Sequence, residues 1–160
     1  KNKYINEIFG NCLVNEHKVV KKTFEENESA YIVSATHNGY EKINYFIHTR
    51  TIKILKKENK IVGCDQLTRI KNYTNLVDYS IRFHVYPGIK IAKTSKEKNV
   101  LISLDNGEGW QITNDTENFE VENSIFLGRN SKVIKNECMS ISGKSEKNNI
   151  NINWTIEKIS

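Results

Sequence analysis

The sequence predicts an all-β protein, an antiparallel β-sandwich of about a dozen short strands. Many stretches alternate apolar and polar side chains with the period of two that is typical of a strand with one buried face. Turn-forming residues separate these stretches at intervals of about 8 to 12 residues, which is the spacing found in sandwiches. No long helical pattern alternates with them, so we expect no parallel sheet covered by helices.

Five strands are predicted in the first half of the chain, because each stretch is rich in aromatic or β-branched residues and is bounded by polar turns. They span residues 8–14, 18–25, 30–36, 45–55 and 61–69. The lysine-rich segment 56–60 is predicted to form the hairpin turn between the last two strands. Gly63 weakens the strand that contains it and predicts a bulge there.

The central part of the chain is a predicted meander. Residues 79–85 form a strand with one apolar face, and Pro87-Gly88 ends it because proline lacks an amide hydrogen and glycine accepts a positive φ. Residues 100–104 repeat the alternation. Asn106-Gly107 then suits a type I′ hairpin turn before the strand that contains Trp110.

Three more strands are predicted after the meander, at residues 119–127, 132–142 and 149–156. The last one has the cleanest alternation, with three isoleucines and a tryptophan on one face. From these patterns we expect six side chains to be buried in the core. They are Phe83, Val85, Ile102, Leu104, Ile152 and Trp154.

Length and composition favour one globular domain that covers residues 1–160. The chain is 38% hydrophobic and 27% charged, so it can bury a single core and is too apolar for a disordered protein. No run approaches the roughly 20 apolar residues of a membrane-spanning helix, so a membrane is not an expected partner.

The net charge is +5, and the basic residues gather at the predicted turns. Lysines at turns and sheet edges commonly keep strands from pairing with other molecules. The alternative is that they attract a polyanion, such as a uronate-containing or sulfated polysaccharide. Nucleic acid is not an expected partner, because no binding motif is present and the aromatic residues lie in the apolar register.

Cysteine usage excludes a disulfide framework. Cys12, Cys64 and Cys138 are odd in number and far apart, and they include no Cys-x-x-Cys pair that would indicate zinc. We expect each of them to be a buried or half-buried apolar side chain. Gly107-Glu108-Gly109 lies between two strands, so it predicts a hairpin and not a phosphate-binding loop. No recognised metal or cofactor motif is present, and we expect neither group in this chain.

One predicted strand places charged side chains in line with aliphatic ones. In residues 45–55 the alternation puts an imidazole and a guanidinium on the apolar face. Two interpretations remain open: another domain or a ligand meets these groups, or carboxylates such as Glu41 and Asp65 cap them in an internal network. The candidate substrate-facing residues are His37, Tyr40, His48 and Arg50.

Several short motifs occur in the order found in a known family. Residues 82–87 read Arg-Phe-His-Val-Tyr-Pro, residues 100–104 read Val-Leu-Ile-Ser-Leu, and residues 107–110 read Gly-Glu-Gly-Trp. Upstream, residues 36–40 read Thr-His-Asn-Gly-Tyr and residues 48–52 read His-Thr-Arg-Thr-Ile. This ordered set resembles the C-terminal β-domain of the heparinase II/III-like family of bacterial polysaccharide lyases. Tyr86 stands where the family pattern has a second histidine, which argues against a metal or proton-transfer role there.

The resemblance implies that the chain is the C-terminal part of a larger lyase that cleaves acidic, uronate-containing polysaccharide by β-elimination. In this family an N-terminal (α/α) toroid packs against the β-domain and supplies the catalytic tyrosine. The catalytic histidine and any metal ligands precede the matched region, so the resemblance implies that this chain holds no catalytic residue and is inactive alone. It also implies a periplasmic or secreted protein. The competing hypothesis is a non-catalytic carbohydrate-binding or interaction β-sandwich.

Overall fold

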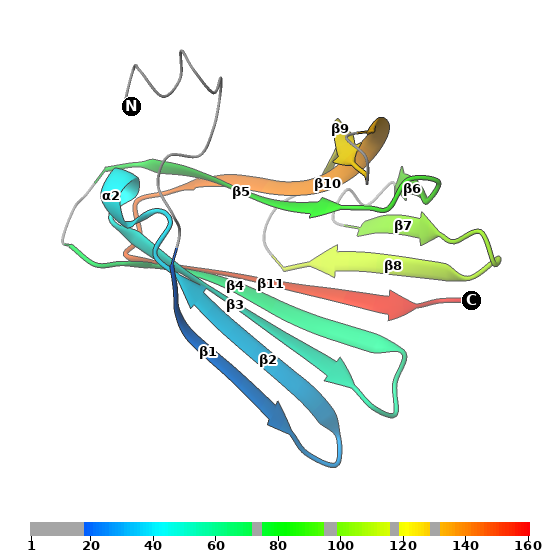
Figure 1. The fold of residues 1–160 in the computed structure, drawn as a ribbon, viewed down its shortest axis with the longest axis horizontal. Helices are drawn as coiled ribbons and strands as arrows, with labels where there is room; N and C mark the ends of the chain where they lie inside the picture. Colours follow the sequence, from blue (N-terminus) through cyan, green and yellow to red (C-terminus); the bar gives the residue numbers. More distant parts are fainter. Residues whose placement is uncertain (1–17, 72–74, 95–98, 116–118, 129–131) are drawn as a thin grey trace.

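The strands of the protein form two antiparallel sheets that pack face to face, as the computed structural model shows (Figure 1). The structure describes residues 18–71, 75–94, 99–115, 119–128 and 132–160, and these form eleven strands. The predicted all-β sandwich is therefore confirmed, while the predicted strand at residues 8–14 lies outside the described residues. No helix in the described part of the chain is long and apolar enough to cross a membrane.

The larger sheet has eight strands in the order β1-β2-β3-β4-β11-β8-β7-β6. The first four follow one another as hairpins, and the last strand of the chain inserts between β4 and β8. The bounds are β1 (Val19–Glu26), β2 (Ala30–His37), β3 (Phe46–Leu55), β4 (Lys60–Arg69), β6 (Lys90–Lys93), β7 (Asn99–Ser103), β8 (Gly109–Asn114) and β11 (Asn149–Lys158).

The smaller sheet has three strands in the order β5-β10-β9. These are β5 (Val77–His84), β10 (Val133–Ser145) and β9 (Phe119–Leu127). The smaller sheet lies over the half of the larger sheet that contains β11, β8, β7 and β6 (Figure 1). Strands β1 and β2 and the end of β3 that contains Ile54 extend beyond it, so the inner face there has no second layer among the described residues.

The core lies between the two sheets. Val85, Ile152 and Trp154 are buried as predicted, but Phe83, Ile102 and Leu104 are half-buried, so the prediction of full burial is wrong for these three. Phe83 still faces inward, since its ring packs edge-on against Trp154 at 5.0 Å between centroids. Because β5 is an edge strand, its inward side chains have a neighbouring strand of the same sheet on one side only.

The two predicted tight turns have different outcomes. Gly88 has a φ of 96°, and the Ile89 amide donates to the Tyr86 carbonyl at 3.2 Å, which confirms the turn at Pro87-Gly88. Among the described residues only Gly107 of the Asn106-Gly107 pair has a positive φ, so the predicted type I′ turn is wrong. A type I turn followed by a left-handed glycine fits the hydrogen bond from the Gly107 amide to the Leu104 carbonyl at 3.0 Å.

Gly63 has a different role from the predicted bulge. The pairing of β4 with β3 and with β11 runs through Gly63 without a shift in register, so the bulge prediction is wrong. Gly63 instead lies opposite Trp154. A Cβ atom at this position would lie 2.1 Å from Cζ2 of the indole. The missing side chain therefore makes room for Trp154 on the inner face of the sheet.

Gly63→Ala is expected to lower the free energy of unfolding by about 1–3 kcal/mol, because the new methyl group forces the packed indole or the strand to move. Urea denaturation followed by circular dichroism would measure the loss. Gly128→Ala is the matched control, since its nearest neighbours would lie at 3.6 Å, an ordinary contact distance. Equal stability of the two variants would contradict this account of Gly63.

Candidate functional site

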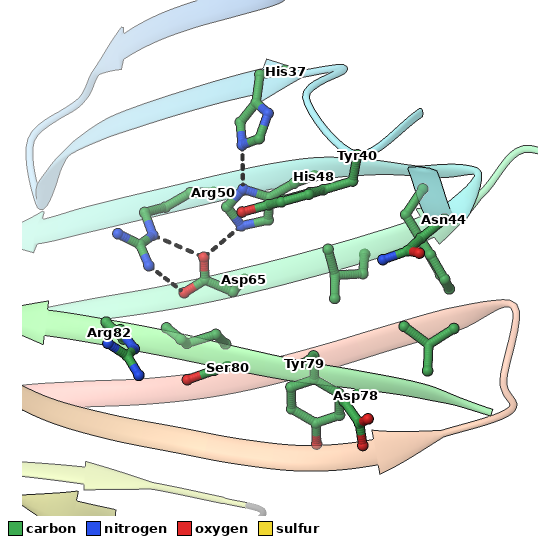
Figure 2. Close-up of a pocket in the computed structure, with 14 residues that line it drawn as sticks. His37, Tyr40, Asn44, His48, Arg50, Asp65, Asp78, Tyr79, Ser80 and Arg82 are labelled. Carbon is green, nitrogen blue, oxygen red and sulfur yellow. Dashed lines mark hydrogen bonds and ion pairs between the residues drawn. The ribbon is translucent and has the colours of Figure 1, made fainter. Parts of the chain in front are cut away.

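All four candidate residues lie together at one end of the inner face, where they line a pocket of about 440 Å³ between the larger sheet and β5 (Figure 2). Strand pairing explains how they meet. His37 of β2 lies directly opposite His48 of β3, and Arg50 of β3 lies directly opposite Asp65 of β4. Since paired residues share a face of the sheet, the sequence alternation and the hairpin register together build the cluster.

Asp65 is the centre of the cluster. Its side chain is only 1% exposed, yet both carboxylate oxygens have donors. Oδ1 accepts from His48 Nε2 at 2.7 Å and from Arg50 Nε at 2.8 Å. Oδ2 accepts from Arg50 Nη2 at 3.1 Å and from Trp154 Nε1 at 2.8 Å. This is the bidentate geometry of an arginine–carboxylate pair with two further donors added.

The carboxyl of Asp65 is ionised in this setting. Burial by itself would raise its pKa, but the hydrogen bonds from His48, Arg50 and Trp154 favour the anion and hold the pKa below the usual value. The negative charge is therefore balanced locally by the guanidinium of Arg50.

The two histidines form a chain with a defined direction of hydrogen bonding. The Gly39 amide donates to Nδ1 of His37 at 3.1 Å, so the hydrogen of this neutral ring is on Nε2. Nε2 of His37 is 2.9 Å from Nδ1 of His48, to which it donates. His48 then carries its hydrogen on Nε2 and donates to Asp65 (Figure 2). One tautomer of each ring satisfies every hydrogen bond in this series from Gly39 to Asp65.

The same series of hydrogen bonds restricts where an additional proton can bind. A proton on Nδ1 of His48 would face the hydrogen that His37 donates, and a proton on Nδ1 of His37 would face the Gly39 amide. Either change places two donors against each other.

Tyr40 lies at the mouth of the pocket. It precedes a single helical turn, α2 (Glu41–Asn44), that the sequence did not predict and that ends at Tyr45 with a φ of 58°. The ring of Tyr40 is 5.3 Å from that of His37 and 6.4 Å from that of His48, and the side chain is 46% exposed. Tyr40 is thus the most accessible aromatic group beside the two imidazoles.

Of the two carboxylates considered from the sequence, Asp65 joins the cluster and Glu41 does not. Glu41 instead accepts from the side-chain amide of Asn38 at 3.2 Å. Trp154 was predicted only as a core residue, and its role as a donor to Asp65 was missed. The two residues are 89 positions apart, and no local pattern indicates that β11 pairs with β4.

Arg50 combines a fixed position with access to the pocket. Two of the five N–H donors of a guanidinium are engaged by Asp65, and the side chain is 36% exposed. Its guanidinium carbon also lies 5.7 Å from the ring centre of Phe83 and 5.9 Å from that of Trp154. Such a group can present the remaining donors to a carboxylate without first being ordered.

The chemistry of the cluster is that of anchored donors and imidazoles. In the part of the chain that the structure describes, no three histidine, cysteine or acidic side chains lie together as metal ligands. Cys64 is half-buried and Cys138 is buried, as predicted, and burial raises the pKa of the Cys64 thiol. Cys12 lies outside the described residues, and the absence of a metal or cofactor stays a prediction.

Comparison with known proteins identifies a family and a fold. The sequence model described as "Heparinase II/III-like, C-terminal" matches residues 3–155. Two crystal structures of the heparan sulfate lyase HepC from Pedobacter heparinus, one of them of a mutant, superpose with a TM-score of 0.73 over 91% of this chain, at 10% identity. A heparinase III superposes with a TM-score of 0.69 over 90% of this chain, at 12% identity. No curated protein matches the sequence. This chain spans 22% of the length of each of these solved chains.

Proposed function

The chain belongs to the heparinase II/III-like family, and we propose on this basis that residues 1–160 are the C-terminal β-sandwich domain of a larger polysaccharide lyase. The similar solved chains are more than four times as long, since this chain spans only 22% of them. The proposed enzyme cleaves acidic, uronate-containing polysaccharide by β-elimination. The rest of the protein, including an N-terminal (α/α) toroid, supplies the groups that this domain lacks, so the domain is inactive alone.

β-Elimination needs three functions. The uronate carboxylate must be neutralised, the proton at C5 must be removed, and the leaving glycosidic oxygen must be protonated. The C5–H electrons form the new C4–C5 double bond as the C4–O bond breaks. In our proposal the domain contributes mainly to neutralising the uronate carboxylate and to positioning the polysaccharide, through hydrogen-bond donors held beside the pocket.

The single observation that carries this proposal is the pocket cluster itself. Arg50 is held by Asp65 and still exposes part of its guanidinium, so it can meet a carboxylate of the glycan or of the adjoining domain. His37, Tyr40 and His48 also line this pocket, and Tyr40 is 46% exposed there. The net charge of +5 also favours an acidic polymer over a neutral one.

The exposed apolar flank of the larger sheet supports a domain of a larger protein over a self-contained carbohydrate-binding module. Phe24, Val33 and Ile54 are 64%, 44% and 45% exposed. A module that folds and works alone would be expected to cover such a face. We further propose that the full protein acts in the periplasm or outside the cell, where acidic polysaccharides are found, and that nucleic acid is not its partner.

Variants of the full-length protein test the role of the pocket. Tyr40→Phe and Arg50→Lys are each expected to lower kcat/KM by about 10- to 100-fold, the effect of losing a hydrogen bond to a charged group. Turnover is measured by the ultraviolet absorbance of the unsaturated uronate on heparan-like, chondroitin-like and alginate substrates. The isolated chain should give no such product.

Tyr86→Phe is the matched control, because Tyr86 is 66% exposed and does not line the pocket. The thermal midpoint of Tyr40→Phe should be close to that of the wild type, since Tyr40 is 46% exposed. Full activity in both pocket variants would show that the cluster only holds the sheet together. Turnover by the isolated chain would contradict the proposed division of labour.

A further inference from the structure

The two sheets differ in width, and the uncovered part of the larger one is apolar. Ile52 and Ile54 follow Arg50 at alternate positions of β3, so they lie on the inner face. Pairing places Val33 opposite Ile52, and Phe24 opposite Val33, on the same face. This inner patch, Phe24, Tyr31, Val33 and Ile54, is 38–64% exposed although it faces the side on which the smaller sheet packs.

Beside the inner patch lies the free edge of β5. It is the terminal strand of the smaller sheet, so among the described residues no strand pairs with its other side. Every second residue of such a strand points its backbone N–H and C=O away from the paired neighbour. Edge strands are commonly protected by proline, lysine or a bulge. β5 has no proline or lysine, and its pairing with β10 is regular.

The free edge of β5 points toward the inner patch. Residues of β5 form one wall of the pocket whose other wall is built by β3 and β4, so β5 lies over these strands (Figure 2). A strand added beside β5 would therefore pass over β3 and then toward β2. Strands in a sheet lie about 4.8 Å apart, so two or three added strands would cover β1, β2 and β3.

We propose that the smaller sheet continues beyond β5 with strands from the remaining part of the same longer protein. The first added strand pairs with the β5 edge, and the apolar sides of the added strands pack on the inner patch. This inference rests on the proposed function in one respect, namely that the chain is part of a longer protein. The sequences of the added strands should alternate apolar and polar residues, because one face of each strand would be buried against the inner patch.

Two observations favour strands from the same protein, rather than a separate protein, as the cover of the inner patch. The chain spans only 22% of solved chains that share its fold, so most of such a protein lies outside it. The first described residue also lies at a suitable place. The Lys18 carbonyl accepts from the Asn38 amide at 3.3 Å, and Asn38 follows His37, so Lys18 lies at the end of the larger sheet that carries the pocket.

The extended sheet also has a consequence for the pocket. The side of the pocket that opens over β2 would gain a wall, while the mouth beside Tyr40 would stay accessible. Arg50 and Asp65 would then be enclosed by protein, which strengthens the interaction of the guanidinium with any carboxylate that enters.

Hydrogen exchange and cysteine labelling test the proposal by comparing the 160-residue chain with the full-length protein. We expect the β5 amides to exchange at least tenfold more slowly in the full-length protein. A Val33→Cys variant should likewise react with a maleimide at least tenfold more slowly there, with the label located by peptide mass. Lys57→Cys, in the exposed β3–β4 turn, is the control and should react equally in both proteins.

Equal β5 exchange and equal Val33→Cys labelling in the two proteins would overturn the proposal. Protection that appears in the 160-residue chain as its concentration rises would also overturn it, because the occupant would then be a second copy. The outcome is separate from that of the proposed function. Lyase activity without β5 protection refutes only the sheet extension, and protection without lyase activity refutes only the enzymatic assignment.

Discussion

Replacing Asp65 with alanine is expected to lower the free energy of unfolding of this chain by about 3–5 kcal/mol, the usual cost of removing one member of a buried ion pair. The substitution leaves the guanidinium of Arg50 without its counter-charge and removes the acceptor of His48 and of the Trp154 indole. Urea denaturation at pH 7, followed by circular dichroism, would measure the loss.

Glu157→Ala is the control for this variant. Glu157 forms an ion pair with Lys60 at 3.3 Å, but both side chains are more than 30% exposed, so the expected loss is about 0–1 kcal/mol. A loss for Asp65→Ala as small as that of the control would contradict the central role of the carboxylate.

The stabilisation by Asp65 should also depend on pH. Because folding lowers the pKa of this carboxyl, the stabilisation is complete above the unfolded-state pKa of about 3.9 and is lost as the pH falls through the lower folded-state value. The difference in unfolding free energy between wild type and Asp65→Ala should therefore be constant between about pH 5 and pH 7. It should shrink below about pH 4. A difference that grows on acidification would have the wrong sign.

Phe119→Ala is expected to cost about 3–5 kcal/mol of unfolding free energy, because it creates a cavity in the core between the sheets. Phe119 is fully buried at the start of β9, and its ring contacts that of Phe83. The matched control is Phe24→Ala, since Phe24 is 64% exposed and should cost the isolated chain well under 1 kcal/mol. Similar losses in the two variants would show that the inner face of β1–β3 is already covered.

The strands could be predicted because their information is local. Alternation in residues 149–156 gave both the strand and its buried face, and Ile152 and Trp154 are indeed buried. Burial was overestimated for Phe83 because alternation indicates a face of a strand but not whether the strand lies at the edge of its sheet. The role of Gly63 was missed for a related reason, since only the pairing of β4 with β11 brings the indole over it.

The candidate cluster was predictable in part. His48 and Arg50 share the face of an apolar strand, and that conflict between charge and register indicated a polar site. Asp65 was considered as a cap because it lies on the neighbouring predicted strand. The hydrogen bond of His37 to His48, and hence the order of donors along the chain to Asp65, depends on the exact register of β2 on β3, which the sequence pattern leaves undetermined.

The position of β11 affects how the protein is made. It is the last of the described strands to be synthesised, yet it occupies the interior of the larger sheet, between β4 and β8. Until residues 149–158 are synthesised, β4 has an unpaired edge and Asp65 lacks its indole donor. Contacts across such long sequence separations form slowly, so we expect the larger sheet to close only after β11 has been synthesised. A chain that stops before Asn149 would keep β1–β4 and β8–β6 as two separate half-sheets, each with an open edge at which it can aggregate.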